Sequence, residues 1–292
     1  MSGAGLRMRE QDHDRGLSAD LDRILAQRAT RRQSLRWLVA GVSLPLAGCG
    51  GGADRADANF GITTSSSDVA TGSGTPVACS VIPEETAGPY PGDGSNHNAK
   101  GVVNALALAG IVRSDIRASV AGASGVADGI PLTIRLQMVN VGAGCTPAAG
   151  AAVYLWHCTR EGGYSMYSDG LLDENFLRGV QEADSQGQLA FTTVFPGCYD
   201  GRMPHVHFEV YPSLAKAGNA ANRIKTSQFT FPLATLNEAY ATAGYAGSAA
   251  KLARISYATD MVFADGVGLQ MASVSGNPVQ GYVVTLNVGI SL

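Results

Sequence analysis

The chain has few charged side chains and no long hydrophobic run. Charged residues make up 15% of its 292 residues and the formal net charge is −3, whereas a nucleic-acid-binding protein normally presents a strongly basic face. It has no stretch of about 18 or more consecutive apolar residues, which is roughly what a transmembrane helix needs. We therefore expect neither a nucleic-acid partner nor a membrane-spanning helix. Histidine is also scarce, with five residues, so few side chains can form a histidine cluster.

The chain does contain enough apolar residues, 45% of the total, to bury a core, and it has 37 glycines. Short segments with alternating apolar and polar residues are separated by Gly/Pro turns, which is typical of half-buried strands. Only residues 233–243 and 248–256 look helical. We predict an all-β fold, an antiparallel β-sandwich with one or two short helices. The predicted strands are residues 132–139, 151–157, 188–195, 204–211, 228–231 and 281–290.

The first 49 residues have the features of an export signal. Arg31 and Arg32 form a twin-arginine pattern, and the apolar run at 37–47 has the length of a signal-peptide core. The sequence Leu-Ala-Gly-Cys that ends at Cys49 resembles a bacterial lipobox, in which the cysteine is lipidated. We expect the chain to be exported to the bacterial cell envelope, on the periplasmic or outer-membrane side. A lipid on Cys49 would then be its only membrane contact.

Residues 50–78 are rich in Gly, Ser, Thr and Asp and show almost no apolar periodicity. Such a composition predicts a flexible linker. Residues 79–292 contain all the predicted strands, and we expect them to form the catalytic β-sandwich domain. The sequence leaves the oligomeric state open.

Once Cys49 is used for lipid, four cysteines remain. In an exported chain four cysteines suggest two disulfides, with three connectivities open. Cys145 and Cys158 flank one predicted strand, and Cys79 and Cys198 lie beside two segments of the candidate site. We expect the pairs Cys145–Cys158 and Cys79–Cys198.

The segment PGCYDGRMPHVHFEVY, residues 196–211, is the densest in chemically active side chains. Successive side chains of a strand point to opposite faces. His205 and His207 therefore share one face, whereas Val206 and Phe208 would anchor the other face in a core. Two imidazoles on one face of a strand can clamp a metal ion, and we predict that they do.

Tyrosines decide which metal fits. Tyr199 lies six residues before His205, and the segment after a predicted strand offers Tyr164 and Tyr167 as second candidates. Gly162-Gly163 would provide a turn that aims Tyr164 off the strand end, so Tyr164 is preferred and Tyr167 is the alternative. Phenolate oxygens are hard anionic donors that favour Fe(3+) over softer divalent ions.

These segments resemble the intradiol ring-cleavage dioxygenases, a family that includes protocatechuate 3,4-dioxygenase and catechol 1,2-dioxygenase. The resemblance covers roughly residues 80–290. The departure is at Asp200-Gly201, where protocatechuate enzymes carry a bulky aromatic residue, so the identity of the substrate stays open. The similar segments are AAVYLWHCTREGGY (151–164), DSQGQLAFTTVFPGCY (184–199), RMPHVHF (202–208), TSQFTF (226–231) and TAGPY (86–90).

The resemblance implies a non-haem ferric enzyme that uses O2 to cleave a small aromatic diol of the catechol type between its two hydroxyls, giving a cis,cis-muconate-type product. It implies a catalytic role for Tyr199, which substrate would displace from iron, for Arg202, which would stabilise developing negative charge, and for Gln228 near the reacting centre. The implied metal ligands are Tyr164, Tyr199, His205 and His207. The implied substrate-binding residues are Thr86, Gly88, Pro89 and Tyr90.

Two other functions remain open at this stage. A metal-free, transthyretin-like β-sandwich at the cell surface could bind a carbohydrate or protein, but it would leave the two histidines and the arginine unexplained. A zinc hydrolase would need a third ligand, for which His157 is a candidate beside His205 and His207. Metal content and colour distinguish the three functions, because a ferric site with tyrosine ligands absorbs visible light and a zinc site does not.

Overall fold

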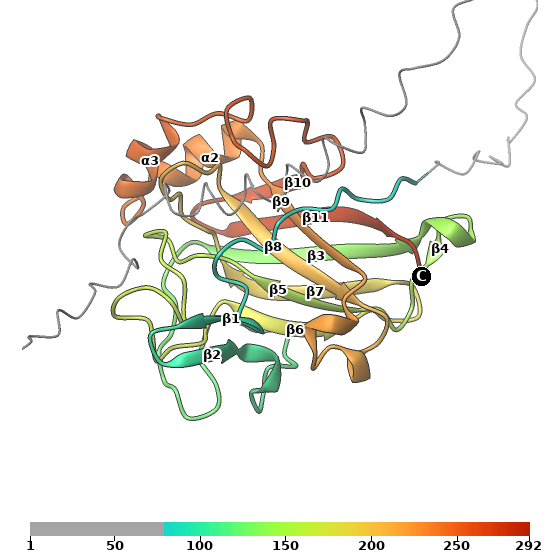
Figure 1. Cartoon of the computed structure of the whole chain (residues 1–292). Helices are drawn as coiled ribbons and strands as arrows, with labels where there is room; N and C mark the ends of the chain where they lie inside the picture. The colour runs from blue at the N-terminus through green and yellow to red at the C-terminus, as the bar shows by residue number, and fades with distance from the viewer. Residues whose placement is uncertain (1–78) are drawn as a thin grey trace, which may run out of the picture. The chain divides into compact units, whose positions relative to one another are not determined.

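Two β-sheets packed face to face form the framework of residues 79–292, the part of the chain that the computed structural model describes (Figure 1). One sheet has the order β10-β11-β3-β4, with β7 also paired to β3, and the other has the order β6-β5-β8-β9. A separate two-stranded ribbon consists of β1 and β2. The predicted export signal, the predicted lipidation site Cys49 and the predicted linker lie outside the described residues.

Strand and helix bounds agree with the predicted segments at most positions. The sequence analysis missed β1, β2, β4, β6 and β10, and the two predicted helices are shorter than expected. The strands are β1 (Asp93–Asn98), β2 (Gly101–Asn104), β3 (Pro131–Asn140), β4 (Thr146–Pro147), β5 (Ala152–Trp156), β6 (Arg178–Glu182), β7 (Gln188–Val194), β8 (His205–Tyr211), β9 (Lys225–Thr230), β10 (Ser273–Asn277) and β11 (Gly281–Ile290), and the helices are α2 (Leu233–Tyr240) and α3 (Ala246–Leu252).

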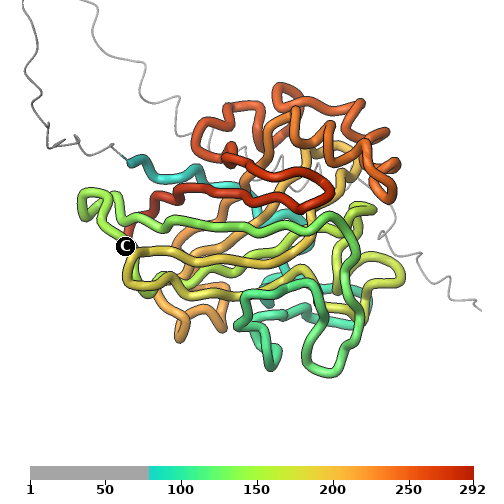
Figure 2. Tube along the Cα trace, turned by 180° about the vertical axis from the view of Figure 1, so that it is seen from behind, coloured from blue at the N-terminus to red at the C-terminus, as the bar shows by residue number. Residues whose placement is uncertain are grey.

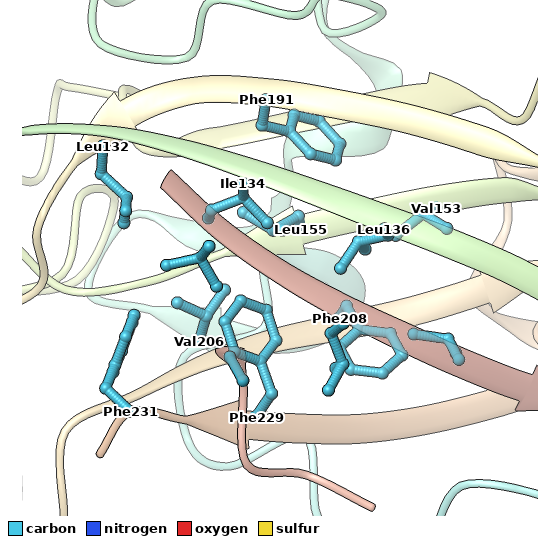
Figure 3. Packing of buried hydrophobic residues seen from close by; sticks show 14 of the residues in the cluster. Leu132, Ile134, Leu136, Val153, Leu155, Phe191, Val206, Phe208, Phe229 and Phe231 are labelled. Carbon is cyan, nitrogen blue, oxygen red and sulfur yellow. The ribbon is translucent and has the colours of Figure 1, made fainter. Parts of the chain in front are cut away.

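The main core lies between the two sheets (Figure 3). Along β3, Leu132, Ile134 and Leu136 are buried and alternate with more exposed residues, as period-two patterning predicts. Val206 and Phe208 of β8 meet them from the other sheet. The sandwich prediction is therefore confirmed, and the apolar face of β8 is fixed in the core.

Strand β8 is buried on both faces. Its second face, which carries His205 and His207, points away from the main core. A second cluster, which includes Tyr154, Trp156 and Tyr164, covers the outer side of this sheet. The candidate site is therefore on the outer side of the four-stranded sheet, closed off by loops.

One pair of strands departs from the antiparallel prediction. β11 runs parallel to β3, from Tyr282 opposite Leu132 to Ile290 opposite Asn140, and Figure 2 shows the two lying side by side (red and green). Alternation reveals that one face of a strand is buried, but it does not reveal direction. No hairpin joins β3 to β11, so the chain is free to cross over and pair them in parallel.

The predicted disulfide pairs are wrong. The structure joins Cys79 to Cys145, with 5.8 Å between their Cα atoms, and Cys158 and Cys198 are buried free thiols. Cys145 and Cys158 lie before and after β5, and a strand rises about 3.3 Å per residue. Cysteines at opposite ends of a strand are therefore too far apart to bond.

Cys79 reaches Cys145 because of how the chain enters the domain. Val81 forms a parallel bridge with Gly289 of β11, and Gly289 lies opposite Val139 near the end of β3. The entering segment is thereby placed beside the turn that carries Cys145. In the part of the chain that the structure describes, none of the helices is long and apolar enough to cross a membrane.

Candidate functional site

Strand β8 brings the two histidine rings together. The Nε2 atoms of His205 and His207 are 2.9 Å apart, and both residues are almost fully buried. The Nδ1 of His205 lies 2.6 Å from the carbonyl oxygen of Met203. A carbonyl can only accept, so Nδ1 carries the proton and donates it, and Nε2 of His205 presents a lone pair to the site.

Two tyrosines approach the same point from separate loops. The Oη of Tyr199 is 3.2 Å from Nε2 of His205. The ring of Tyr164 lies 5.8 Å from the Tyr199 ring and 6.3 Å from the His207 ring, measured between centroids. Gly162, with φ of +96°, turns the chain just before Tyr164. The four predicted ligands are therefore brought together.

Tyr164 and Tyr167, the two alternatives for the second phenol, have different surroundings. The Oη of Tyr167 accepts a hydrogen bond from the Gly92 amide and donates one to the Asn96 side chain. By contrast, the buried Oη of Tyr164 has no hydrogen-bond partner among residues 79–292. A buried hydroxyl without a partner is costly, which is what a ligand lacking its metal ion would show.

The donor set fits a hard metal ion. Two donors that each lie about 2.1 Å from one ion at a right angle are about 3 Å apart, close to the distance between Nε2 of His205 and Nε2 of His207. Two phenol oxygens complete a set of two nitrogens and two oxygens. This composition favours Fe(3+), because phenolate is hard and anionic.

His157, the candidate third ligand of a zinc site, is turned elsewhere. Its Nδ1 lies 2.8 Å from the Cys158 carbonyl oxygen, and its Nε2 lies 2.7 Å from Oγ1 of Thr193. Within residues 79–292, no group of three or more His, Cys, Asp or Glu side chains is arranged to hold a metal ion. The arrangement therefore lacks the three-histidine set that the zinc hydrolase alternative requires.

Burial shapes the charge of each candidate ligand. It lowers the pKa of His205 and of His207, and the Arg202 charge lowers both further, so both imidazoles are neutral and able to ligate near pH 7. Burial also raises the pKa of Tyr164 and of Tyr199 well above the usual phenol value. Phenolates at this position therefore need a strong positive charge beside them, as a trivalent ion would supply.

Arg202 and Gln228 form one side of the site. The guanidinium of Arg202 donates through Nη2 to Oε1 of Gln228 at 2.7 Å, and Nε2 of Gln228 donates to the Thr86 carbonyl oxygen at 2.8 Å. Both residues are buried. Nε of Arg202 donates to Oδ2 of Asp260 at 2.9 Å. The sequence analysis did not predict Asp260.

Comparisons with known proteins fit this architecture. The family model Dioxygenase_C, described as "Dioxygenase", matches residues 114–223. The solved structure of an intradiol ring-cleavage dioxygenase from Tetranychus urticae superposes with a TM-score of 0.56 and 26% identity, covering 73% of this chain and 95% of that one. The chain therefore resembles the intradiol ring-cleavage dioxygenases in sequence and fold.

Curated sequence relatives match this chain over short segments. A chlorocatechol 1,2-dioxygenase from Rhodococcus opacus is 36% identical over 19% of this chain and 21% of its own length. One from Pseudomonas sp. (strain P51) is 34% identical over 22% of this chain and 32% of its own length. The chain therefore matches only a fifth to a third of the length of these relatives.

The segment from Thr86 to Tyr90 lies against two of the candidate ligands, His207 and Tyr164. Gly88 has φ of +69°, and a Cβ built there would lie 3.3 Å from Cε1 of His207. The ring of Tyr90 lies 4.9 Å from that of Tyr164 and 5.3 Å from that of Tyr167. Pro89 accepts a hydrogen bond through its carbonyl oxygen. Of the predicted substrate-binding residues, Gly88 and Tyr90 therefore lie next to predicted ligands, His207 and Tyr164, and Thr86 contacts Gln228.

Arg178 is a second residue that the sequence analysis missed, and it fastens this segment in place. It is fully buried, and its five N–H groups all donate to neutral oxygens. A lone arginine between Leu177 and Gly179 in an apolar stretch was the available signal. The acceptors are the carbonyl oxygens of Tyr90, Pro91 and Ser165 and the hydroxyls of Tyr154 and Ser165.

Arg178 therefore joins the Thr86–Tyr90 segment to the loop that carries Tyr164. All five donors of its fork are used.

Proposed function

We propose that this protein opens a catechol-type ring between its two hydroxyl-bearing carbons with O2, giving a cis,cis-muconate-type product. A ferric ion would be held by Tyr164, Tyr199, His205 and His207. When bound, such an ion supplies Lewis-acid chemistry and a template for the diol. The observation that carries the proposal is the approach of Nε2 of His205 to both Nε2 of His207 and Oη of Tyr199.

The two phenols have different roles in this proposal. Tyr164 is buried, whereas Tyr199 is partly exposed. A substrate hydroxyl can therefore reach Tyr199 more readily, and we assign it the part of proton acceptor. Tyr164 has no such access, and we assign it a permanent place in the ligand set.

Arg202 provides fixed positive charge beside the proposed position of the substrate ring. Its charge lowers the pKa of Tyr199, against the larger effect of burial, so the guanidinium lies close enough to act on that phenol. A preorganised cation stabilises negative charge that develops on a substrate during reaction. Gln228 holds the guanidinium on one side through its Oε1. Thr86, Gly88, Pro89 and Tyr90 would line the space over the ring.

Purified full-length protein tests the proposal directly. We expect bound iron, a red-brown absorption that shifts when a catechol is added, and O2 uptake with formation of a muconate. The names of the two chlorocatechol dioxygenases make chlorinated catechols a second probe. A fully iron-loaded but colourless protein would rule the proposal out.

Matched variants test the ligand assignment. Tyr164→Phe and Tyr199→Phe should each change the visible absorption, because each removes one phenolate. Tyr167→Phe is the control, since its hydroxyl bonds to Gly92 and Asn96 and should leave the absorption in place. If only Tyr167→Phe altered the spectrum, the assignment of Tyr164 would be wrong.

We further propose that the chain works in the cell envelope, exported by its twin-arginine pattern and anchored by a lipid on Cys49. The Cys79–Cys145 disulfide supports this proposal, because such bonds persist in oxidising compartments. Membrane fractionation of the wild type and of Cys49→Ala tests it. The wild type should pellet with membranes and the variant should not.

A further inference from the structure

The carboxylate of Asp260 lies behind Arg202, on the stretch between α3 and β10, and Asp260 is in none of the five similar segments quoted in the sequence analysis. Asp260 is fully buried and Arg202 is 4% exposed. The Oδ2 atom of Asp260 accepts from Nε of Arg202 at 2.9 Å and from the Met203 amide at 2.6 Å. This carboxylate therefore holds both the side chain of Arg202 and the backbone beside it.

The same carboxylate is itself fixed. Its Oδ1 accepts hydrogen bonds from the amides of Val262 and Phe263 at 2.8 and 3.1 Å. The guanidinium carbon of Arg202 also lies over the Phe263 ring, 5.8 Å from its centroid. The turn from Asp260 to Phe263 therefore contacts Arg202 by an ion pair and by a cation–π contact.

These contacts fix the direction in which the remaining N–H donors of the Arg202 guanidinium point. Nε is bound to Asp260 and Nη2 to Gln228, and Nη1 has no hydrogen-bond partner among residues 79–292. A planar guanidinium held at two of its three nitrogens can no longer rotate. The two N–H groups of Nη1 and the second N–H of Nη2 are then left for a substrate or for charge that develops on it.

We propose that Asp260 is a positioning residue that fixes the orientation of the Arg202 guanidinium for ring cleavage. This inference rests on the proposed function. Asp260 does not touch the candidate ligand atoms, and it acts through Arg202. Removing its charge should lower turnover while leaving the ferric site assembled.

Asp260→Asn is the principal variant. An asparagine can still offer one oxygen to the Val262 and Phe263 amides, but its amide nitrogen would then face the donors of Arg202 and Met203. We expect kcat to fall about 10- to 100-fold, as for other residues that orient a functional group. Iron content and the visible absorption should stay at the wild-type level. Asp265→Asn, an exposed residue of the same stretch, is the matched control and should change neither.

A double-mutant cycle separates positioning from a general structural effect. Arg202→Gln alone should lower kcat about 100- to 1000-fold. If Asp260 acts through Arg202, adding Asp260→Asn to Arg202→Gln should cost less than about 3-fold more, because the two effects are coupled. If Asp260→Asn lowered kcat as much in the Arg202→Gln background as in the wild type, the proposal would be overturned. Loss of iron or colour in Asp260→Asn alone would also overturn it.

Arg202→Lys provides a test that leaves Asp260 intact, should Asp260→Asn not fold. Lysine keeps the charge but cannot reach Asp260 and Gln228 together through a rigid fork. We expect most of the Arg202→Gln loss in Arg202→Lys, and near-wild-type kcat there would overturn the proposal. If wild-type protein with full iron and the visible absorption consumed no O2 with any catechol, the proposed function would fail and this inference with it. If the wild type cleaved a catechol but the double-mutant cycle showed no coupling between Asp260 and Arg202, only the proposed role of Asp260 would be refuted.

Discussion

The unpartnered hydroxyl of Tyr164 predicts a mutational effect whose sign depends on iron. Tyr164→Phe removes only that hydroxyl and keeps the ring, which packs against Tyr90 and Tyr199. In the iron-free protein this hydroxyl is buried without a hydrogen bond. Its removal should therefore stabilise the iron-free protein, whereas in the iron-loaded protein it removes a ligand.

The size of both effects follows from the contacts. An unsatisfied buried polar group costs about 1–3 kcal/mol, so the free energy of unfolding of the iron-free Tyr164→Phe variant should rise by about that amount. Iron stabilises the fold in proportion to the logarithm of its affinity. A 10- to 100-fold weaker affinity removes about 1.4–2.8 kcal/mol of that stabilisation.

Urea unfolding of iron-loaded and of chelator-treated protein measures how Tyr164→Phe changes the free energy of unfolding in each state. Tyr167→Phe is the control. The Tyr167 hydroxyl makes two hydrogen bonds, so its removal should lower the free energy of unfolding by about 1–3 kcal/mol whether or not iron is bound. If Tyr164→Phe destabilised the iron-free protein as much as Tyr167→Phe does, the hydroxyl of Tyr164 would have a partner and the reasoning would fail.

Three further predictions concern the framework around the site. Arg178→Lys leaves at least two buried acceptors unpaired and should lower the free energy of unfolding by about 2–5 kcal/mol, measured by urea unfolding. An unchanged urea midpoint would show that the hydrogen bonds of Arg178 do not hold the two segments together. Replacing both Cys79 and Cys145 by serine opens a loop of 66 residues and should cost about 4 kcal/mol, again in urea. Burial lowers the pKa of His157 to about 4, so only the unfolded chain takes up its proton as pH falls from about 6.5 to 4. Stability is full above that window and falls within it by about 3 kcal/mol, whereas His157→Gln should show a shallower pH dependence; equal slopes would exclude this role.

The local part of the site was predictable from sequence. A strand alternates its faces, so the spacing of His205 and His207 alone places both imidazoles on one side. The choice of Tyr164 over Tyr167 rested on the glycine turn before it. The structure adds an independent reason, because the hydroxyl of Tyr167 already has two partners.

The long-range part was not predictable from one sequence. Asp260 meets Arg202 from 58 residues away, and a single aspartate before a short apolar run looks the same in sequence whether it is buried or solvated. The disulfide partner of Cys79 depends on which strand the entering segment lies beside, and the direction of β11 depends on a crossover. None of these features leaves a local periodic signal.

The hydrogen bonds around Gln228 have a consequence for how metal loading relates to folding. Gln228 bonds to Thr86 near the start of the described domain and to Gln270 near its end, and Arg202 lies between them in sequence. No partly folded intermediate that lacks either end of the domain can complete this arrangement. Iron affinity should therefore report the integrity of the whole domain, and a lesion far from the metal would show itself first as slow or incomplete metal uptake.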